Sequence, residues 1–172
     1  DNMRDYNGYS FDFEPIAREL YRITKDGGVV VWIVSDGVEN GSETGTSFRQ
    51  ALFFKDCGFN INDTMIWQKE CFTFPDRVRY PQVFEYMFVF SKGKAKTVNL
   101  IKDRENIRHG KSLSGTTYRC KDGSIKPRRK NAPTTVAEFG TRFNVWNIPS
   151  EKSNKTGHPA VFPKQIAIDH IK

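Results

Sequence analysis

A basic segment is the part of the chain whose residue types point most directly to chemistry. Residues 92–130 hold thirteen Lys and Arg but only three acids, a formal charge of +10. The other 133 residues carry fourteen basic and seventeen acidic side chains, so the +7 of the chain arises in this segment. Clustered cations neutralise phosphates and are the electrostatic footprint of a nucleic-acid partner. The alternative interpretation is a solvated, lysine-rich loop.

Asp36 is a second residue whose position suggests chemistry. It follows Val29–Val34, a continuous apolar run whose length and flanking glycines favour a strand buried on both faces. Ligands of open α/β sheets bind beyond the carboxyl ends of the strands, so Asp36 is a candidate binding carboxylate. The competing interpretation is that Asp36 only caps a turn with Gly37.

The segment 41–47 (GSETGTS) has the glycines of a phosphate-binding loop but neither its spacing nor its lysine. We therefore interpret it as a polar loop that leads into a helix. Ser47 and Gln50 have the S-x-x-Q spacing of a capping box, which predicts that the helix starts there.

Aromatic side chains are frequent near the basic segment and the polar loops. Such rings can stack on a base that has been extruded from a duplex. Most Phe and Tyr side chains nevertheless belong to the core, which is the competing interpretation. The residues concerned are Tyr6, Tyr9, Phe11, Phe72, Phe74, Tyr80 and Tyr118.

The cysteines and histidines predict neither a disulfide framework nor a metal site. Cys57, Cys71 and Cys120 are odd in number and lack a C-x-x-C spacing, and the three histidines are far apart. This usage is typical of a reducing cytoplasm, where we expect the protein. No apolar run approaches the roughly 20 residues that span a bilayer.

The elements that must position these residues alternate between helices and strands. Apolar periodicity and capping residues predict helices over 13–23, with Asp12 as N-cap, from Ser47 onward and from Pro163 onward. Strands are expected over 29–34, 61–67, 83–90 and 143–148. The second and third should pair antiparallel because no crossover helix separates them. Residues 1–12 and the basic segment show no period and are expected to be loops, and the order of elements predicts an α/β fold.

Four segments together resemble a known family. They are RDYNGYSFDFEPIARELYRITKDGGVVVWIVSD, GSETGTSFRQAL, RYPQVFEYMFVFSKGK, and RFNVWNIP with HPAVFP. They resemble DNA amino-methyltransferases that transfer a methyl group from S-adenosylmethionine to N6 of adenine or N4 of cytosine, in the group whose catalytic motif precedes the cofactor motif. The resemblance covers nearly the whole chain and is weakest between about 100 and 140. It implies a partial Rossmann-like three-layer sandwich, with a mixed, mostly parallel sheet and an inserted basic target-recognition region.

The resemblance also divides the chain. Residues 1–91 would belong to the catalytic domain, residues 92–141 to the target-recognition region, and residues 142–172 to the catalytic domain again, at the edge of the cofactor site. Double-stranded DNA is the expected partner. The expected DNA-binding residues are Lys102, Arg104, Arg108, Lys111, Arg119, Lys121, Lys126, Arg128, Arg129 and Lys130.

The expected cofactor, S-adenosylmethionine, would be bound by few residues of the chain. His158, Pro159, Phe162 and Pro163 match the family block that closes over its methionine end, and Asp36 is added as the acid at the strand end. The family's (D/S/N)-P-P-(Y/F) catalytic tetrapeptide is expected just before Asp1 and Asn2, so no catalytic residue is assigned within the chain. A glycine-rich cofactor motif is expected after residue 172.

We therefore expect the chain to be the central part of a larger enzyme and to be inactive alone. Two alternatives stay open: a DNA-binding module without catalytic activity, and an RNA or protein methyltransferase on the same scaffold. No metal ion is expected in the reaction.

Overall fold

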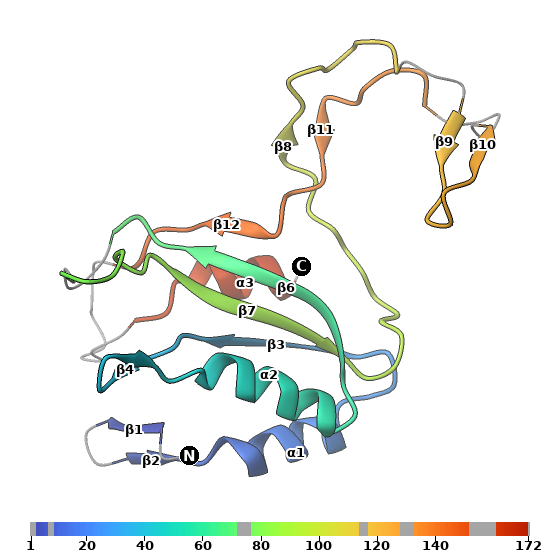
Figure 1. Ribbon diagram of the computed structural model, residues 1–172. Coiled ribbons are helices and arrows are strands. Elements are labelled where there is room, and N and C mark those ends of the chain that lie inside the picture. The colour runs from blue at the N-terminus through green and yellow to red at the C-terminus, as the bar shows by residue number, and fades with distance from the viewer. Residues whose placement is uncertain are drawn as a thin grey trace. The chain divides into compact units, whose positions relative to one another are not determined.

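The computed structural model describes residues 3–6, 9–71, 77–113, 117–127, 133–151 and 161–171, and these form two compact units. Unit 1 comprises Asp1–Asn99 with Asn144–Lys172, and unit 2 comprises Leu100–Phe143 (Figure 1). Unit 2 therefore begins eight residues later than the expected insert and ends two residues later. The cause is a set of backbone hydrogen bonds that hold the start of the basic segment on unit 1: Gly27 donates to Lys92 (2.7 Å), and Lys96 donates to Gly27 (3.1 Å).

Unit 1 is built on a four-stranded sheet with the strand order β12-β6-β7-β3. The strands are β3 (Val29–Val34), β6 (Asn60–Gln68), β7 (Phe84–Ser91) and β12 (Val145–Asn147). β7 is antiparallel to both β6 and β3, whereas β12 is parallel to β6. Three strands thus share one direction and β7 opposes them. The predicted mixed sheet and the antiparallel pair of the second and third strands are confirmed.

Helices cover both faces of this sheet. Along β7, Phe88 and Phe90 point to the face that packs on α1 (Phe13–Ile23) and α2 (Thr46–Asp56), whereas Met87 between them points to the other face. That other face packs on α3 (Lys164–Ile171), whose His170 ring stacks on Trp146 of β12. Figure 1 shows the resulting arrangement of helices around the sheet. The predicted three-layer α/β sandwich is confirmed.

The core between the sheet and the first two helices is mainly aromatic. Phe54 of α2 is completely buried and stacks on Phe90 of β7, with 4.5 Å between ring centroids and 18° between planes. The rings of Phe59 and Trp32 lie 5.8 Å and 5.1 Å from the same side chain. Phe54 is therefore the residue that joins α2, β3 and β7.

The expectation that β3 is buried on both faces is wrong. Val29 is exposed and the other five residues of the strand are only partly buried. Within the described residues β3 lies at the end of the sheet and pairs with β7 alone. An apolar run identifies a strand, but it does not tell how many neighbours the strand has.

The predicted capping box of the second helix is also wrong. α2 begins at Thr46 after Gly45, whose φ of +65° is left-handed, and neither Ser47 nor Gln50 caps its own helix. Both side chains are buried instead. The Oε1 atom of Gln50 accepts a hydrogen bond from Nε1 of Trp32 (2.7 Å), which ties α2 to β3. Tertiary partners have therefore replaced the local ones that the spacing suggested.

Several segments expected to be loops form short antiparallel pairs. β1 (Met3–Tyr6) pairs with β2 (Tyr9–Phe11), and β4 (Val38–Glu39) pairs with β5 (Ser42–Glu43). In unit 2, β8 (Arg104–Glu105) pairs with β11 (Phe139–Gly140), and β9 (Thr117–Arg119) pairs with β10 (Ile125–Pro127). The turn between β4 and β5 is Asn40-Gly41, and both residues have positive φ. This Asn-Gly hairpin signal was present in the sequence.

No helix among the described residues is both long and apolar enough to cross a membrane. In the same residues, no three His, Cys, Asp or Glu side chains gather as metal ligands would.

Candidate cofactor edge and nucleic-acid interface

The carboxyl ends of β3, β6 and β12 lie along the same edge of the sheet, which we call the carboxyl edge. The register shows this directly, since Tyr86 of β7 lies opposite both Val34 and Ile66, and Gln68 lies opposite Asn147. The segments that begin at Ser35, Lys69 and Ile148 therefore all leave from one edge. Ligands of open α/β sheets bind at such an edge.

Asp36 lies at the carboxyl edge, and its carboxylate is bound to the start of α2. Oδ1 accepts hydrogen bonds from the backbone N–H of Ser47 (3.0 Å) and from Oγ1 of Thr44 (3.3 Å). Oδ2 accepts a hydrogen bond from Oγ of Ser47. A carboxylate is favourable there because the free N–H groups of a helix start carry positive partial charge. Asp36 thus caps α2 from outside the helix, and its role toward a cofactor stays a prediction.

Phe162 also lies at the carboxyl edge. Its ring meets Trp67 of β6 edge-on, with 5.9 Å between centroids and 66° between planes. The indole Nε1 of Trp67 donates to the carbonyl of Ile148 (2.7 Å), which fixes the indole at the end of β12. Phe162 remains 45% exposed, so part of its ring is free to contact a ligand.

The other predicted residues of the same block have different outcomes. Pro163 is buried, and its carbonyl accepts a hydrogen bond from the N–H of Ile166 (3.1 Å), so it starts α3 as expected. His158, Pro159, Asp1 and Asn2 lie outside the described residues.

Trp67 and Lys69 also lie at the carboxyl edge, and no sequence motif singles them out. The ammonium of Lys69 pairs with the carboxylate of Glu85 on β7 and lies 5.0 Å from the centre of the Trp67 ring. Trp67 becomes a neighbour of Phe162 only through folding, because 95 positions separate the two along the chain. The position of Trp67 near the carboxyl end of a predicted strand was the feature of the sequence that could have indicated its place at this edge.

The aromatic residues proposed to stack on a base separate into groups. Phe11 stacks on Trp32 at 6.3 Å, which makes it part of the fold. Tyr80 and Tyr118 are exposed and remain candidates. Phe72 and Phe74 lie outside the described residues, as do the side chains of Tyr6 and Tyr9.

His170 of α3 makes a contact whose strength depends on pH. Its ring stacks on Trp146 at 4.5 Å, and its Nε2 atom is buried without a hydrogen-bond partner. Burial lowers the pKa of His170 from its ordinary value of 6.5, and the neighbouring charge of Asp169 opposes this shift. The folded protein therefore favours the neutral imidazole.

We expect the free energy of unfolding to fall as the pH drops through 6.5 toward the lower pKa of folded His170. In this range the unfolded chain binds a proton at His170 that the folded chain does not. Well above pH 6.5 the imidazole is neutral in both states and the contribution is constant. His170→Phe keeps an aromatic ring against Trp146 and should make the melting temperature less dependent on pH between about 5 and 7. An equal fall in both proteins would contradict this prediction.

Unit 2 is held together by two arginines. The guanidinium of Arg104 lies 4.3 Å from the centre of the Phe143 ring, and its Nε donates to the carbonyl of Thr141 (3.0 Å). Arg142 pairs with Asp103, and the hydrogen bond lowers the pKa of that carboxyl below its ordinary value. Arg104, predicted to bind DNA, is therefore partly buried and engaged within the unit.

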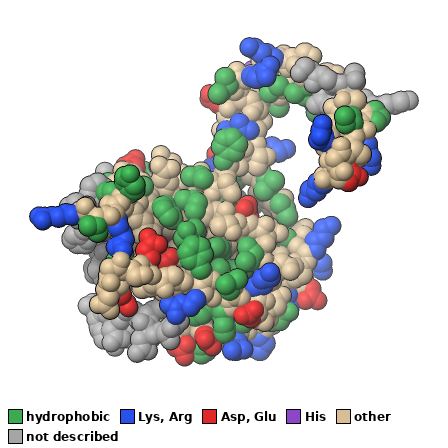
Figure 2. Space-filling model, viewed as in Figure 1, with side chains coloured by type: hydrophobic (Ala, Val, Ile, Leu, Met, Phe, Trp, Pro, Cys, Tyr) green, Lys and Arg blue, Asp and Glu red, His purple; other side chains and the backbone are tan. Residues whose placement is uncertain are grey.

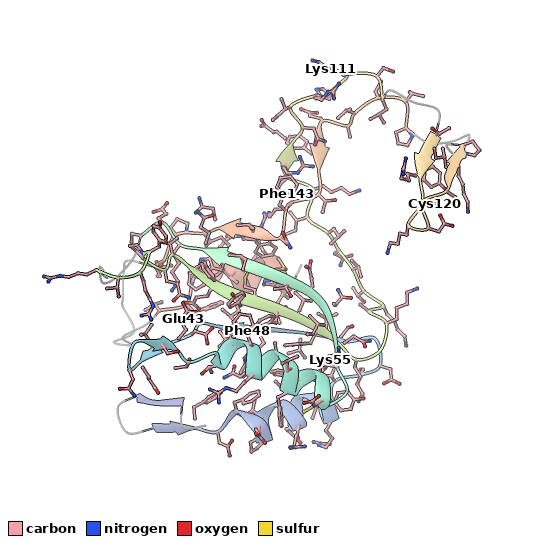
Figure 3. The ribbon with its side chains drawn as sticks, in the orientation of Figure 1. Glu43, Phe48, Lys55, Lys111, Cys120 and Phe143 are labelled. Carbon is pink, nitrogen blue, oxygen red and sulfur yellow. The ribbon has the colours of Figure 1, made fainter. Side chains whose placement is uncertain are left out.

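The other predicted DNA-binding residues that the structure describes are exposed. They are Lys102, Arg108, Lys111, Arg119, Lys121 and Lys126. Arg128, Arg129 and Lys130 lie outside the described residues. Figure 2 shows Lys and Arg side chains gathered on unit 2, and Figure 3 labels Lys111, Cys120 and Phe143 along it. Leu100–Phe143 contain eleven basic and four acidic residues, a net +7, whereas the rest of the chain holds sixteen of each.

The hairpin of β9 and β10 carries three of these cations: Arg119, Lys121 and Lys126. Its turn is closed by Asp122, whose Oδ1 accepts hydrogen bonds from the N–H (2.9 Å) and the hydroxyl (2.7 Å) of Ser124. These bonds lower the pKa of Asp122 and give the hairpin a defined shape. Its cations are therefore held on a short ordered element.

A mixed sheet with helices on both faces, and a basic unit inserted in the sequence between two of its strands, define the chain as an α/β protein with a basic insert. The DNA methylase model of the N6/N4 methyltransferase family matches residues 1–172, so the chain belongs to that family. The predicted family is confirmed.

Among curated proteins, the chain is 53% identical to the orphan methyltransferase M.BamHII of Bacillus amyloliquefaciens over 179 residues. The match covers 99% of this chain and 66% of that protein, so the chain spans about two thirds of its relative's length. Among solved structures, the crystal structure of the M1.HpyAVI–SAM complex matches with a TM-score of 0.44 and 22% identity, over 56% of this chain and 45% of that one.

Proposed function

We propose that the complete protein transfers a methyl group from S-adenosylmethionine to the exocyclic amino nitrogen of cytosine (N4) or adenine (N6) in double-stranded DNA. The observation that carries this proposal is the match of the N6/N4 DNA methylase family over residues 1–172. The +7 of unit 2 supports a polyanionic substrate. With DNA as the substrate, the protein acts in the cytoplasm.

The reaction depends more on positioning the target base and the cofactor than on catalytic side chains. The amino nitrogen attacks the sulfonium methyl carbon, the carbon–sulfur bond breaks, and the nitrogen loses a proton to water. The target base must first leave the duplex, because its amino group is inaccessible inside it. Unit 2 would hold the DNA while the carboxyl edge binds one end of the cofactor. Orientation of this kind supplies much of the rate enhancement in such transfers.

The residues at the carboxyl edge fit the cofactor's charge. S-adenosylmethionine carries a sulfonium and an ammonium, and cations are attracted by aromatic faces and carboxylates. The edge offers the exposed part of the Phe162 ring, and the Oδ2 atom of Asp36 has one described hydrogen-bond donor. One strand, β7, lies between β6 and β3, so the carboxyl ends of β6, near Trp67, and of β3, near Asp36, are about 10 Å apart. An extended small molecule can bridge that distance.

Phe162→Ala should weaken binding of S-adenosylmethionine to the complete protein by about 3- to 30-fold, as loss of a cation–π surface predicts. Calorimetric titration of the cofactor measures this. The matched control is Ile171→Ala, which removes an 85% exposed side chain from α3. An unchanged affinity in the Phe162 variant would contradict the assignment of Phe162.

The proposed function itself is tested by transfer of labelled methyl groups to DNA. The complete protein should methylate DNA, while the 172-residue chain alone should not. The second candidate function, DNA binding without catalysis, is favoured by the charge of unit 2 and predicts binding with no transfer by the complete protein. Transfer to RNA or to a protein, with none to DNA, would favour the remaining alternative.

A further inference from the structure

We propose that Asn106–Lys111, which we call the recognition turn, enters a groove of the DNA, with Ile107 as an apolar wedge against the bases and Arg108 as a hydrogen-bond donor to base edges. The inference deepens the proposed function and rests on it. It identifies the part of unit 2 that distinguishes one sequence from another.

The recognition turn is built as an ordered projection from a paired segment. Backbone hydrogen bonds join Asn106 to Glu138 (2.9 Å), Gly110 to Val136 (3.0 Å) and Leu113 to Thr134 (2.9 Å), on both sides of the turn. The side-chain amide of Asn106 donates to the carbonyl of Ala137 (2.9 Å). Inside the turn the N–H of His109 donates to the carbonyl of Asn106 (2.9 Å). Its tip is therefore presented in a defined position.

Ile107 lies on this turn with a relative exposure of 101%, so its side chain is fully open to solvent. A single exposed apolar residue is ordinary on a protein surface. This one stands on an ordered turn beside the exposed cations Arg108 and Lys111. An apolar tip between cations suits DNA, because the cations attract phosphates while Ile side chains are among those that insert between base steps.

Arg108 is suited to base contacts rather than to holding the fold. Unlike Arg104 and Arg142, its guanidinium has no described hydrogen bond or ion pair, and its side chain is exposed. Arginine is one of the side chains that read base pairs and groove width in the minor groove, the groove from which apolar wedges insert. Its place next to Ile107 brings both contacts to one position along the groove.

A pocket of about 370 Å³ lies at the recognition turn. Its wall combines apolar side chains (Ile107, Leu113, Val136) with polar and cationic ones (Arg104, Asn106, Arg108, Ser112), so both residues of the proposed contact border it. Deoxyribose and base edges also combine apolar surface with a few hydrogen-bonding groups. The turn thus stands beside a concave surface that can receive the DNA next to the inserted side chain.

The test uses the complete protein and a pool of 30-base-pair duplexes with a randomised centre. Rounds of selection should enrich a preferred duplex, and fluorescence anisotropy then measures affinity for that duplex and for a scrambled one across a range of salt. The variants are Ile107→Ala and Arg108→Gln, with Ile171→Ala as the control for an exposed isoleucine. Thermal melting verifies that each variant is folded.

We expect Ile107→Ala to bind the preferred duplex about 5- to 30-fold more weakly, with the same slope of log K against log salt, because an apolar contact releases no counterions. Arg108→Gln should relax the preferred sequence at one position. Affinity of Ile107→Ala for the scrambled duplex, and all affinities of Ile171→Ala, should be unchanged. If selection enriches a preferred duplex but the wild-type protein and Ile107→Ala bind it equally well, this inference is overturned and the proposed function is not. Absence of any DNA binding by wild type overturns the proposed function as well.

Discussion

Phe54→Ala is expected to lower the free energy of unfolding by about 3–5 kcal/mol, the largest effect on stability that we predict. Phe54 is completely buried, stacks on Phe90, and contacts the rings of Phe59 and Trp32. Removing its ring leaves a cavity between α2, β3 and β7 that these large neighbours cannot fill without leaving their own positions. Urea unfolding followed by tryptophan fluorescence measures the change, since Trp32 lies next to the deleted ring.

Leu52→Ala on the same helix is the matched control. Its side chain is 58% exposed, so the substitution should cost less than about 1 kcal/mol. If both substitutions cost the same, the packing of α2 against the sheet would have to be different from the one described here. If neither substitution changes the urea concentration at the midpoint of unfolding, α2 would not take part in the cooperative unfolding of unit 1.

Neutralising the hairpin of β9 and β10 is expected to have the largest effect on DNA binding. The triple variant Arg119→Gln, Lys121→Gln, Lys126→Gln removes three exposed cations from one ordered element. If each contacts a phosphate, the slope of log K against log salt should become shallower by about 0.9 per residue. At about 0.1 M salt this corresponds to an affinity between about 100- and 1,000-fold lower. Anisotropy with a duplex of mixed sequence measures both quantities.

The control removes the same charge from unit 1. Lys25, Lys55 and Lys164 are exposed, and their replacement by Gln also lowers the net charge by three. An equal loss of slope in both triple variants would mean that overall charge, rather than the hairpin, governs binding. A comparison with Ile107→Ala distinguishes phosphate contacts from base contacts. The triple variant of the hairpin should change the slope of log K against log salt, whereas Ile107→Ala should leave it unchanged.

The contact between Lys69 and Trp67 at the carboxyl edge illustrates why the residues of this edge could be predicted only in part. Asp36 and Phe162 were found because one follows a strand and the other matches a family block. Trp67 and Lys69 carry no such mark, and their relation to Phe162 arises when β6 and β12 pair in parallel. Parallel pairing joins segments that are distant in sequence, so no local pattern reports it.

Local patterns alone determined the strands of the sheet, the three helices and the concentration of positive charge, while the family was indicated by the resemblance of four whole segments. The first three depend on spacings within a few residues or on residue type, which the sequence contains directly. The tertiary structure alone decided that Asp36 caps α2, that Gln50 binds Trp32, and that β3 pairs with β7 alone within the part of the chain that the structure describes. It also decided which cations are engaged, as Arg104 is, and which are exposed, as Arg108 is. The physical reason is that polar side chains take whichever partner folding brings within hydrogen-bond distance, and that partner is set by long-range pairing.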